Sequence, residues 1–152
     1  MCAELSSHLE STISRILGVV CVLGVATCTG QVDPTGLAGT WRLVEFQSSD
    51  DAIGVVRPDS GAIYTMTLEQ DGKVSMQLNC NRAGGTWTAT PTNADNGTFG
   101  FGPLAMTRAF CPPPSLDTQI ARHAQYIRSY VVRDGRLHLS LMADGGIYVW
   151  TR

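Results

Sequence analysis

The sequence predicts an α+β domain built mostly from antiparallel strands, with a curved, barrel-like sheet and one packed α-helix over about residues 115–129. Two observations carry this prediction. Beyond residue 38, apolar residues mostly alternate with polar ones, which indicates half-buried strands. One segment, 116–127, changes to the spacing of a helix. Strands interrupted by a single helix are typical of an antiparallel sheet that carries the helix on one face.

The strands follow from alternation and from the turns between them. In the first strand, Trp41, Leu43 and Glu45 are expected on one face, and Arg42, Val44 and Phe46 on the other. In three further strands, alternate residues share one face of their strand: Tyr64, Met66 and Leu68; Val74, Met76 and Leu78; Leu137, Leu139 and Leu141. Residues 87–90 and 98–101 flank a polar loop, and residues 147–150 form a last strand. Glycines at 70–73 and 144–146 mark hairpin turns, because glycine adopts positive φ without steric cost.

The helix is predicted from an apolar stripe and its flanking residues. Leu116, Ile120, Ala124 and Ile127 recur at helical spacing. Ser115 is placed to cap the N-terminus, and the prolines at 112–114 prevent an earlier start. Asp117 in the first turn and Arg128 in the last suit the helix dipole. The resulting helix covers about fourteen residues.

The N-terminus is predicted to be a targeting segment. Residues 16–28 form an uncharged run that is too short for a membrane span, which needs about 20 residues, but long enough for a signal peptide. The sequence Val25-Ala26-Thr27-Cys28 resembles a lipobox, in which the cysteine becomes lipidated. We therefore expect a lipoprotein signal peptide at 1–27, lipid attachment at Cys28, a linker at 28–38 and a domain at 39–152. Cleavage without lipidation, giving a soluble secreted protein, is the alternative.

Length and charge restrict the partners. The 152 residues suffice for one domain with its own core. Of the 13 acidic and 11 basic residues, all but Glu4, Glu10 and Arg15 follow residue 27, so the remaining chain is close to neutral. It lacks the basic excess that nucleic-acid binding requires. We expect no nucleic-acid partner, a monomer, and a membrane contact through the lipid anchor alone.

Two cysteines belong to the predicted domain. Cys2, Cys21 and Cys28 lie at or before the end of the apolar run, which leaves Cys80 and Cys111. Exported thiols meet an oxidising compartment, so a structural disulfide is the leading interpretation. A redox pair would usually have closer spacing, and zinc would need two more ligands, for which His123 and His138 are available. Cys80 with His123 would form a nucleophilic pair only if Cys80 were free.

Two cysteine-centred segments resemble a known family. They are 79–87 (NCNRAGGTW) and 102–112 (GPLAMTRAFCP), and they are accompanied by 37–41 (LAGTW) and 135–139 (GRLHL). Together they are similar to the META domain family, which includes HslJ-like bacterial heat-shock proteins. The resemblance implies a small β-rich domain with a packed helix in envelope proteins that are linked to stress, antibiotic tolerance or secretion. It implies no catalytic residue.

The motif residues have two interpretations. Asn79, Asn81 and Gly85 could belong to a recognition site, as could Thr107 and Arg108. Alternatively, the asparagines bond local backbone at a strand end, and Thr107 and Arg108 satisfy neighbouring loops. His123 is expected to be a half-buried helix residue. Residues 93–97 resemble a calcium loop but lack the acidic ligand that should follow, so we expect no metal and no cofactor.

These observations predict a non-enzymatic lipoprotein of the bacterial cell envelope. It would face the periplasm, with the outer membrane favoured because Thr29 is not the aspartate associated with inner-membrane retention. It would bind an envelope protein partner or support stress tolerance. The alternative is a carrier of a small apolar ligand or lipid in the curved sheet. An enzyme such as a hydrolase would need a Ser-His-Asp order or paired carboxylates, and neither pattern is found.

Overall fold

The computed structural model describes residue 33 and residues 35–152. The expected signal peptide at 1–27 and the expected lipid-attachment residue Cys28 lie outside these described residues. Within them, no helix has both the length and the apolar character needed to cross a membrane.

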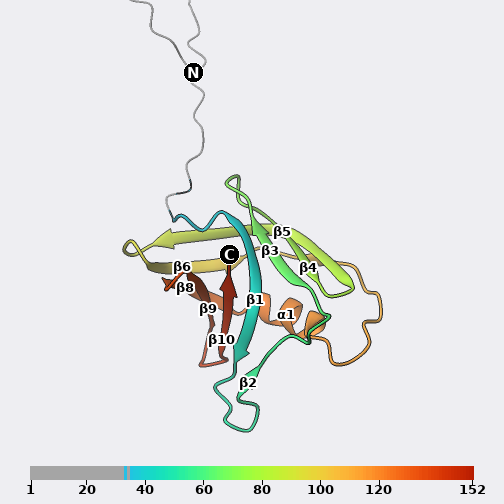
Figure 1. The fold of residues 1–152 in the computed structure, drawn as a ribbon. Helices are drawn as coiled ribbons and strands as arrows, with labels where there is room; N and C mark the ends of the chain where they lie inside the picture. Colours follow the sequence, from blue (N-terminus) through green and yellow to red (C-terminus); the bar gives the residue numbers. More distant parts are fainter. Residues whose placement is uncertain (1–32, 34) are drawn as a thin grey trace, which may run out of the picture.

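Eight antiparallel strands close into a barrel (Figure 1). In their order around the barrel they are β1 (Gly39–Gln47), β3 (Tyr64–Leu68), β4 (Lys73–Leu78), β5 (Asn81–Pro91), β6 (Asn96–Phe101), β8 (Ile127–Arg133), β9 (Arg136–Leu141) and β10 (Ile147–Thr151). Pairing of β10 with β1 completes the circle. Two short strands, β2 (Val55–Val56) and β7 (Ala105–Met106), add to β1 and β5. The predicted antiparallel, barrel-like fold is therefore confirmed.

Most residues that the alternation predicts to face inward form the core of the barrel. The inward-facing sets of β3, β4 and β9 are buried as expected, apart from Leu141, which is half-buried. Gly72 has a φ of +83° in the turn between β3 and β4. The prediction for β1 is wrong beyond Leu43: its register with β10 shifts between Leu43 and Glu45, so Phe46 is buried and Glu45 is only half-buried. An extra residue in one strand reverses the alternation that follows it.

The helix α1 (Asp117–Ala124) is shorter than the predicted span of 115–129. Ile127 and Arg128, which were expected in the helix, begin β8, because residue 127 and residues 129–133 pair with β9, and residues 129–131 pair with β6. Ser115 is not the N-cap: Leu116 occupies that position, and no side chain caps the helix. The Arg128 guanidinium nevertheless donates to the backbone oxygens of Gln125 and Ile127, near the helix C-terminus.

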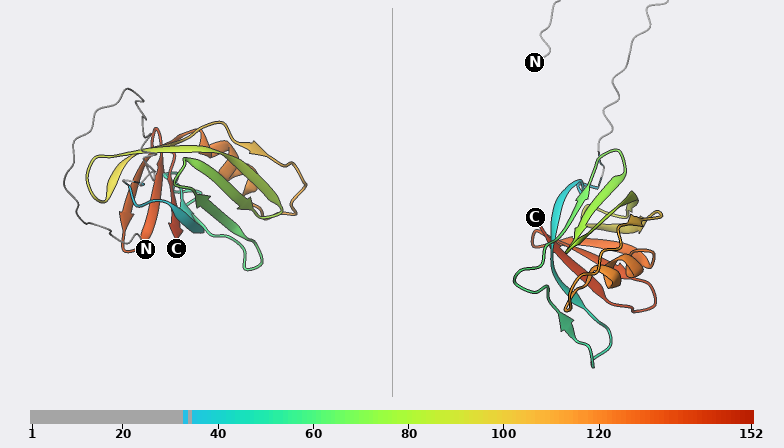
Figure 2. Two further views of the ribbon diagram at one scale, coloured as in Figure 1. Left: turned by 90° about the horizontal axis from the view of Figure 1, so that it is seen from above. Right: turned by 90° about the vertical axis from the view of Figure 1, so that its right-hand side faces the viewer.

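The two ends of the barrel are closed by different segments. At the end where β1 finishes, α1 packs Ile120 and Ala124 into the core. At the end where β1 begins, Leu37 is fully buried and its carbonyl accepts a bond from Trp41 Nε1 at 2.8 Å. Leu37 lies in the stretch that the sequence assigned to a linker, so the folded domain begins before residue 39. Figure 2 shows the helix and residues 35–38 at opposite ends of the strand layer.

Candidate functional site

A disulfide joins the two cysteine-centred segments. Cys80 and Cys111 are bonded, with their Cα atoms 5.7 Å apart, which confirms the predicted pairing. Cys80 lies in the turn between β4 and β5, and Cys111 lies in the segment that leads to α1. The bond therefore ties this segment to the end of the barrel that α1 covers. Because Cys80 is bonded, it is not available as a nucleophile for His123.

Asn81 is the centre of the hydrogen-bond network next to the disulfide. It is only 1% exposed. Its Nδ2 donates to the Ala109 carbonyl and to Asp117 Oδ2, each at 2.9 Å. Its Oδ1 accepts from Thr107 Oγ1 at 2.9 Å and from the Ala109 N–H at 2.8 Å. One side chain thus holds three parts of the chain together: strand β5, residues 107–109 and the first turn of α1.

Asn79 and Ser115 extend this network toward the barrel. Asn79 has a φ of +57°, and its Nδ2 donates to Ser115 Oγ at 3.1 Å. Ser115 Oγ in turn donates to Asp117 Oδ1 at 2.8 Å. Burial opposes ionisation of Asp117, but the hydrogen bonds from Ser115, Asn81 and two backbone N–H groups outweigh it and lower the pKa of this carboxyl. The structure therefore favours the ionised form of Asp117, with a side-chain hydrogen bond to each carboxylate oxygen.

Gly85 and Thr107 are explained by the packing of β7 on β5. A Cβ atom at Gly85 would lie 2.5 Å from the Pro103 carbonyl oxygen and 2.8 Å from Leu104 Cδ2, so only glycine fits. The Thr107 N–H donates to the Arg82 carbonyl at 2.9 Å, and Thr107 Oγ1 accepts from the Arg82 N–H at 3.0 Å. Of the five candidate recognition residues, Asn79, Asn81, Gly85 and Thr107 thus have structural contacts. Arg108 is exposed and lines a groove.

The groove runs between α1 and the segment 101–110. Its larger part has a volume of about 660 Å³ and includes Met106, Arg108, Phe110 and Arg122. A second hollow of about 480 Å³ continues it toward Pro103 and Gln125. The two parts share Leu104 and Ala121. Phe110 is 85% exposed, the most exposed large apolar side chain among the described residues.

This groove was not predicted from the sequence. The available signal was Phe110, a large aromatic residue between Arg108 and Cys111. The disulfide at Cys111 restricts how far this residue can move. Its exposure could not be read from the sequence.

A polar cluster lies on the inner side of α1. His123 Nδ1 is 2.9 Å from Tyr148 Oη, and Gln119 Nε2 donates to the same hydroxyl at 3.3 Å. Burial, followed by the nearby Arg122 charge, lowers the pKa of His123. Burial also raises the pKa of the Tyr148 hydroxyl well above its usual range. Burial thus favours the neutral form of both groups, and their contacts join the helix to strand β10 of the barrel.

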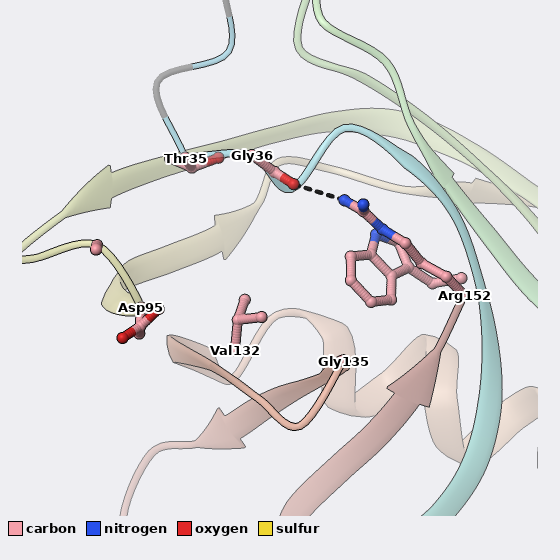
Figure 3. Close-up of a pocket in the computed structure, with 8 residues that line it drawn as sticks. Thr35, Gly36, Asp95, Val132, Gly135 and Arg152 are labelled. Atoms are coloured by element: carbon pink, nitrogen blue, oxygen red, sulfur yellow. Dashed lines mark hydrogen bonds between the residues drawn. The ribbon is translucent and has the colours of Figure 1, made fainter.

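The opposite end of the barrel has a smaller pocket of about 180 Å³ (Figure 3). The Arg152 guanidinium donates to the Gly36 carbonyl at 2.6 Å and lies 4.6 Å from the centre of the Trp41 ring. Its charge is thus used to hold residues 36–38 in place. Across the described residues, no group of three or more His, Cys, Asp or Glu side chains is arranged to hold a metal ion.

The fold and the groove define the class of this protein: a closed, eight-stranded antiparallel barrel with a helix over one end and a disulfide-anchored loop beside the helix. The chain belongs to the META domain family, whose model matches residues 35–151. A search of curated proteins found no match.

Two solved structures share the fold. One is an NMR structure of a protein from Burkholderia xenovorans, with a TM-score of 0.61 and 23% identity, covering 75% of this chain and 81% of that one. The other is a crystal structure of a DUF4847 family protein from Bacteroides vulgatus, with a TM-score of 0.52 and 17% identity, covering 75% of this chain and 92% of the other. At these identities the likeness concerns the fold alone.

Proposed function

We propose that this META domain is a non-enzymatic lipoprotein of the bacterial cell envelope. In this proposal it faces the periplasm and binds a partner protein in support of stress tolerance. The partner would bind in the groove between α1 and residues 101–110. The observation that carries this proposal is the exposure of Phe110, which is 85% exposed at the rim of that groove. Aromatic and arginine side chains are enriched where protein interfaces gain most of their energy.

The groove is supported by a rigid frame. The disulfide holds the segment at Cys111, and Asn81 bonds both the N–H and the carbonyl of Ala109. Phe110 lies between these two anchors. A surface that is already ordered loses less entropy on binding than a mobile loop does. This arrangement favours a binding surface over a loop that only connects β7 with α1.

The envelope location rests on the sequence. The uncharged run at 16–28 and the lipobox-like residues that end at Cys28 support export and a lipid anchor. The Cys80–Cys111 bond supports an oxidising compartment, since disulfides are rare in the bacterial cytoplasm. The carrier alternative has less support, because large side chains fill the barrel interior: Trp41, Tyr64 and Trp150 are each at most 2% exposed.

The partner is tested by photo-crosslinking in living cells. A photoreactive amino acid is placed at position 110, and a matched one at position 131, where the exposed Val131 lies on β8, outside the groove. The expected result is a discrete adduct from position 110 that is absent from position 131. Adducts of equal yield at both positions, or none at 110, would contradict the proposal.

The location is tested by the intact mass of the protein from the membrane fraction, with and without reduction and thiol alkylation. We expect a chain that begins at Cys28 with added acyl mass, and with Cys80 and Cys111 alkylated only after reduction. A chain of unprocessed mass with free thiols would contradict the envelope location.

A further inference from the structure

The outer edge of β7 has no strand beside it in the described part of the chain. β7 pairs only with β5. The strand β6 pairs with β5 from Trp87 onward, and β8 pairs with β6 only at Asn96, Gly97 and Thr98. Neither strand therefore reaches the outer edge of β7, and the groove separates this edge from α1.

The backbone of β7 has hydrogen-bonding groups on that edge. The Thr107 N–H donates to the Arg82 carbonyl, so the backbone of Thr107 faces β5. Backbone N–H and C=O groups alternate between the two edges of a strand, so those of Met106 face away from β5. Such an edge is a template on which another strand can pair.

The side chains around this edge match an extended chain with acidic residues. Leu104, Met106 and Arg108 alternate along the segment and all line the groove, with Ala121 of α1 among the residues opposite. Arg108 and Arg122 are exposed, and no carboxylate among the described residues lies within ion-pair distance of either. Asp117, the acid in the groove lining, already has both carboxylate oxygens bonded to Ser115 and Asn81.

We propose that the free edge of β7 accepts an extended acidic segment of a partner protein as an added strand. Backbone bonds at Met106 supply the pairing, Leu104 and Met106 contact the apolar side chains of the segment, and Arg108 and Arg122 bind its carboxylates. Strand addition of this kind gains affinity from backbone bonds and specificity from alternate side chains. The inference rests on the proposed function, because it names the chemistry of the partner at the same groove.

The test uses synthetic heptapeptides labelled with a fluorophore, and the full-length protein. Their second, fourth and sixth residues, which share one face of a strand, are glutamate, valine and valine, with serine at the other positions. One comparison peptide has lysine in place of glutamate, and another has the acidic sequence with every backbone nitrogen methylated. Binding is measured by fluorescence anisotropy at low salt. The protein variants are the double change Arg108→Glu with Arg122→Glu, and a control, Arg42→Glu, at an exposed arginine of β1 outside the groove. Circular dichroism checks that each variant is folded.

The acidic peptide is expected to bind the unchanged protein and the Arg42→Glu control equally. The double variant should lose at least about tenfold in affinity for it, since close charge pairs across interfaces have large coupling energies. The double variant should instead prefer the lysine peptide. Backbone methylation should abolish binding, and hydrogen exchange at the Met106 amide should slow in the complex.

Several results would overturn the inference: no binding of the acidic peptide, equal binding of the methylated peptide, or equal binding by the double variant. Sedimentation with anionic phosphatidylglycerol vesicles that depends on the two arginines, without peptide binding, would assign the surface to lipid and overturn it as well. Crosslinking from position 110 distinguishes a failure of strand addition from a failure of the partner site. An adduct there without peptide binding rejects only strand addition, whereas the absence of any adduct rejects the partner site itself.

Discussion

A single buried amide organises the end of the barrel that carries the groove. Asn81 uses both its donor and its acceptor group, and its partners come from the segment before the disulfide and from α1. A buried polar group is stabilising only while its partners are present, because each orphaned partner then has to remain buried without a bond. The groove therefore depends on a residue that barely reaches its surface.

The change Asn81→Leu keeps the approximate volume but removes every side-chain bond of Asn81. It leaves the buried Asp117 carboxylate with one fewer donor, so we expect a loss of about 3 kcal/mol in the free energy of unfolding. Urea denaturation under oxidising conditions measures it. Thr88→Ala, at an exposed position on the same strand, is the control and should change stability by less than about 0.5 kcal/mol. Equal losses for both variants would mean that the network contributes nothing.

Two adjacent glycines offer a matched comparison. At Gly85 a Cβ atom would overlap the backbone of Pro103, whereas at Gly84 its nearest neighbour would be the Val74 carbonyl oxygen at 3.7 Å, an ordinary contact. We expect Gly85→Ala to destabilise the domain by about 2 kcal/mol, as overpacking does. Gly84→Ala should be close to neutral. Thermal unfolding of the two variants checks this, and a similar melting temperature for both would refute the assigned contact.

At the scale of elements, strand pairing of β8, rather than the local spacing of apolar residues, determines where the C-terminus of α1 lies. Leu116, Ile120, Ala124 and Ile127 share helical spacing, so nothing within that stretch distinguishes the last residue from the others. Ile127 belongs to β8, which pairs with β9 and β6. Ser115 was a reasonable cap by residue type. Its hydroxyl instead donates to Asp117 Oδ1, accepts from Asn79 Nδ2 and lies within hydrogen-bond distance of Tyr64 Oη, and both of the latter residues are distant in sequence.

The contact of α1 with the barrel is expected to weaken in acid. The folded-state pKa of His123 is lowered, so the folded protein binds fewer protons than the unfolded chain between that value and about 6.5. Stability from neutral His123 is therefore present above about pH 6.5 and is lost as the pH falls through the folded-state pKa. Unfolding free energies measured from pH 7.5 to 5 should fall more steeply for the unchanged protein than for His123→Gln.

His138 provides an internal check on that experiment. Its pKa is also lowered, first by burial and then by Arg133 and Arg136, so it adds a slope of the same sign to both proteins. The difference in pH dependence between the unchanged protein and His123→Gln thus gives the contribution of His123 alone. Parallel curves would show that His123 does not couple protonation to folding.

At the scale of the whole molecule, closure depends on a strand near each end of the described chain. β1 pairs with β3 through its first residues and with β10 from Arg42 onward, and the shift between Leu43 and Glu45 follows the first two pairs with β10. Such bulges bend a strand and increase its twist, which helps a sheet to close. Closure gives each of the eight barrel strands a partner on both sides, whereas the short β7 pairs on one side only and its other edge borders a groove.

Residues before β1 are part of this closed structure. Leu37 is fully buried, and Asp33 accepts bonds from the N–H groups of Thr35 and Ala38. We expect Leu37→Ala to lose about 3 kcal/mol of unfolding free energy, the typical cost of emptying a leucine site in a core. Val131→Ala, at an exposed position on β8, is the comparison and should lose much less. An unchanged melting temperature for Leu37→Ala would instead support a linker that reaches to residue 38.

The sequence by itself determined the strands with clear alternation, their antiparallel arrangement, the family and, as the favoured interpretation, the pairing of the two domain cysteines. These properties depend on a period of two residues, on turn glycines and on there being two cysteines in the domain. The tertiary structure decided the bulge in β1, the end of α1, the roles of Asn81 and Gly85, and the groove beside β7. Each of these depends on a segment far away in the sequence, and local pattern contains no information about which distant backbone will approach.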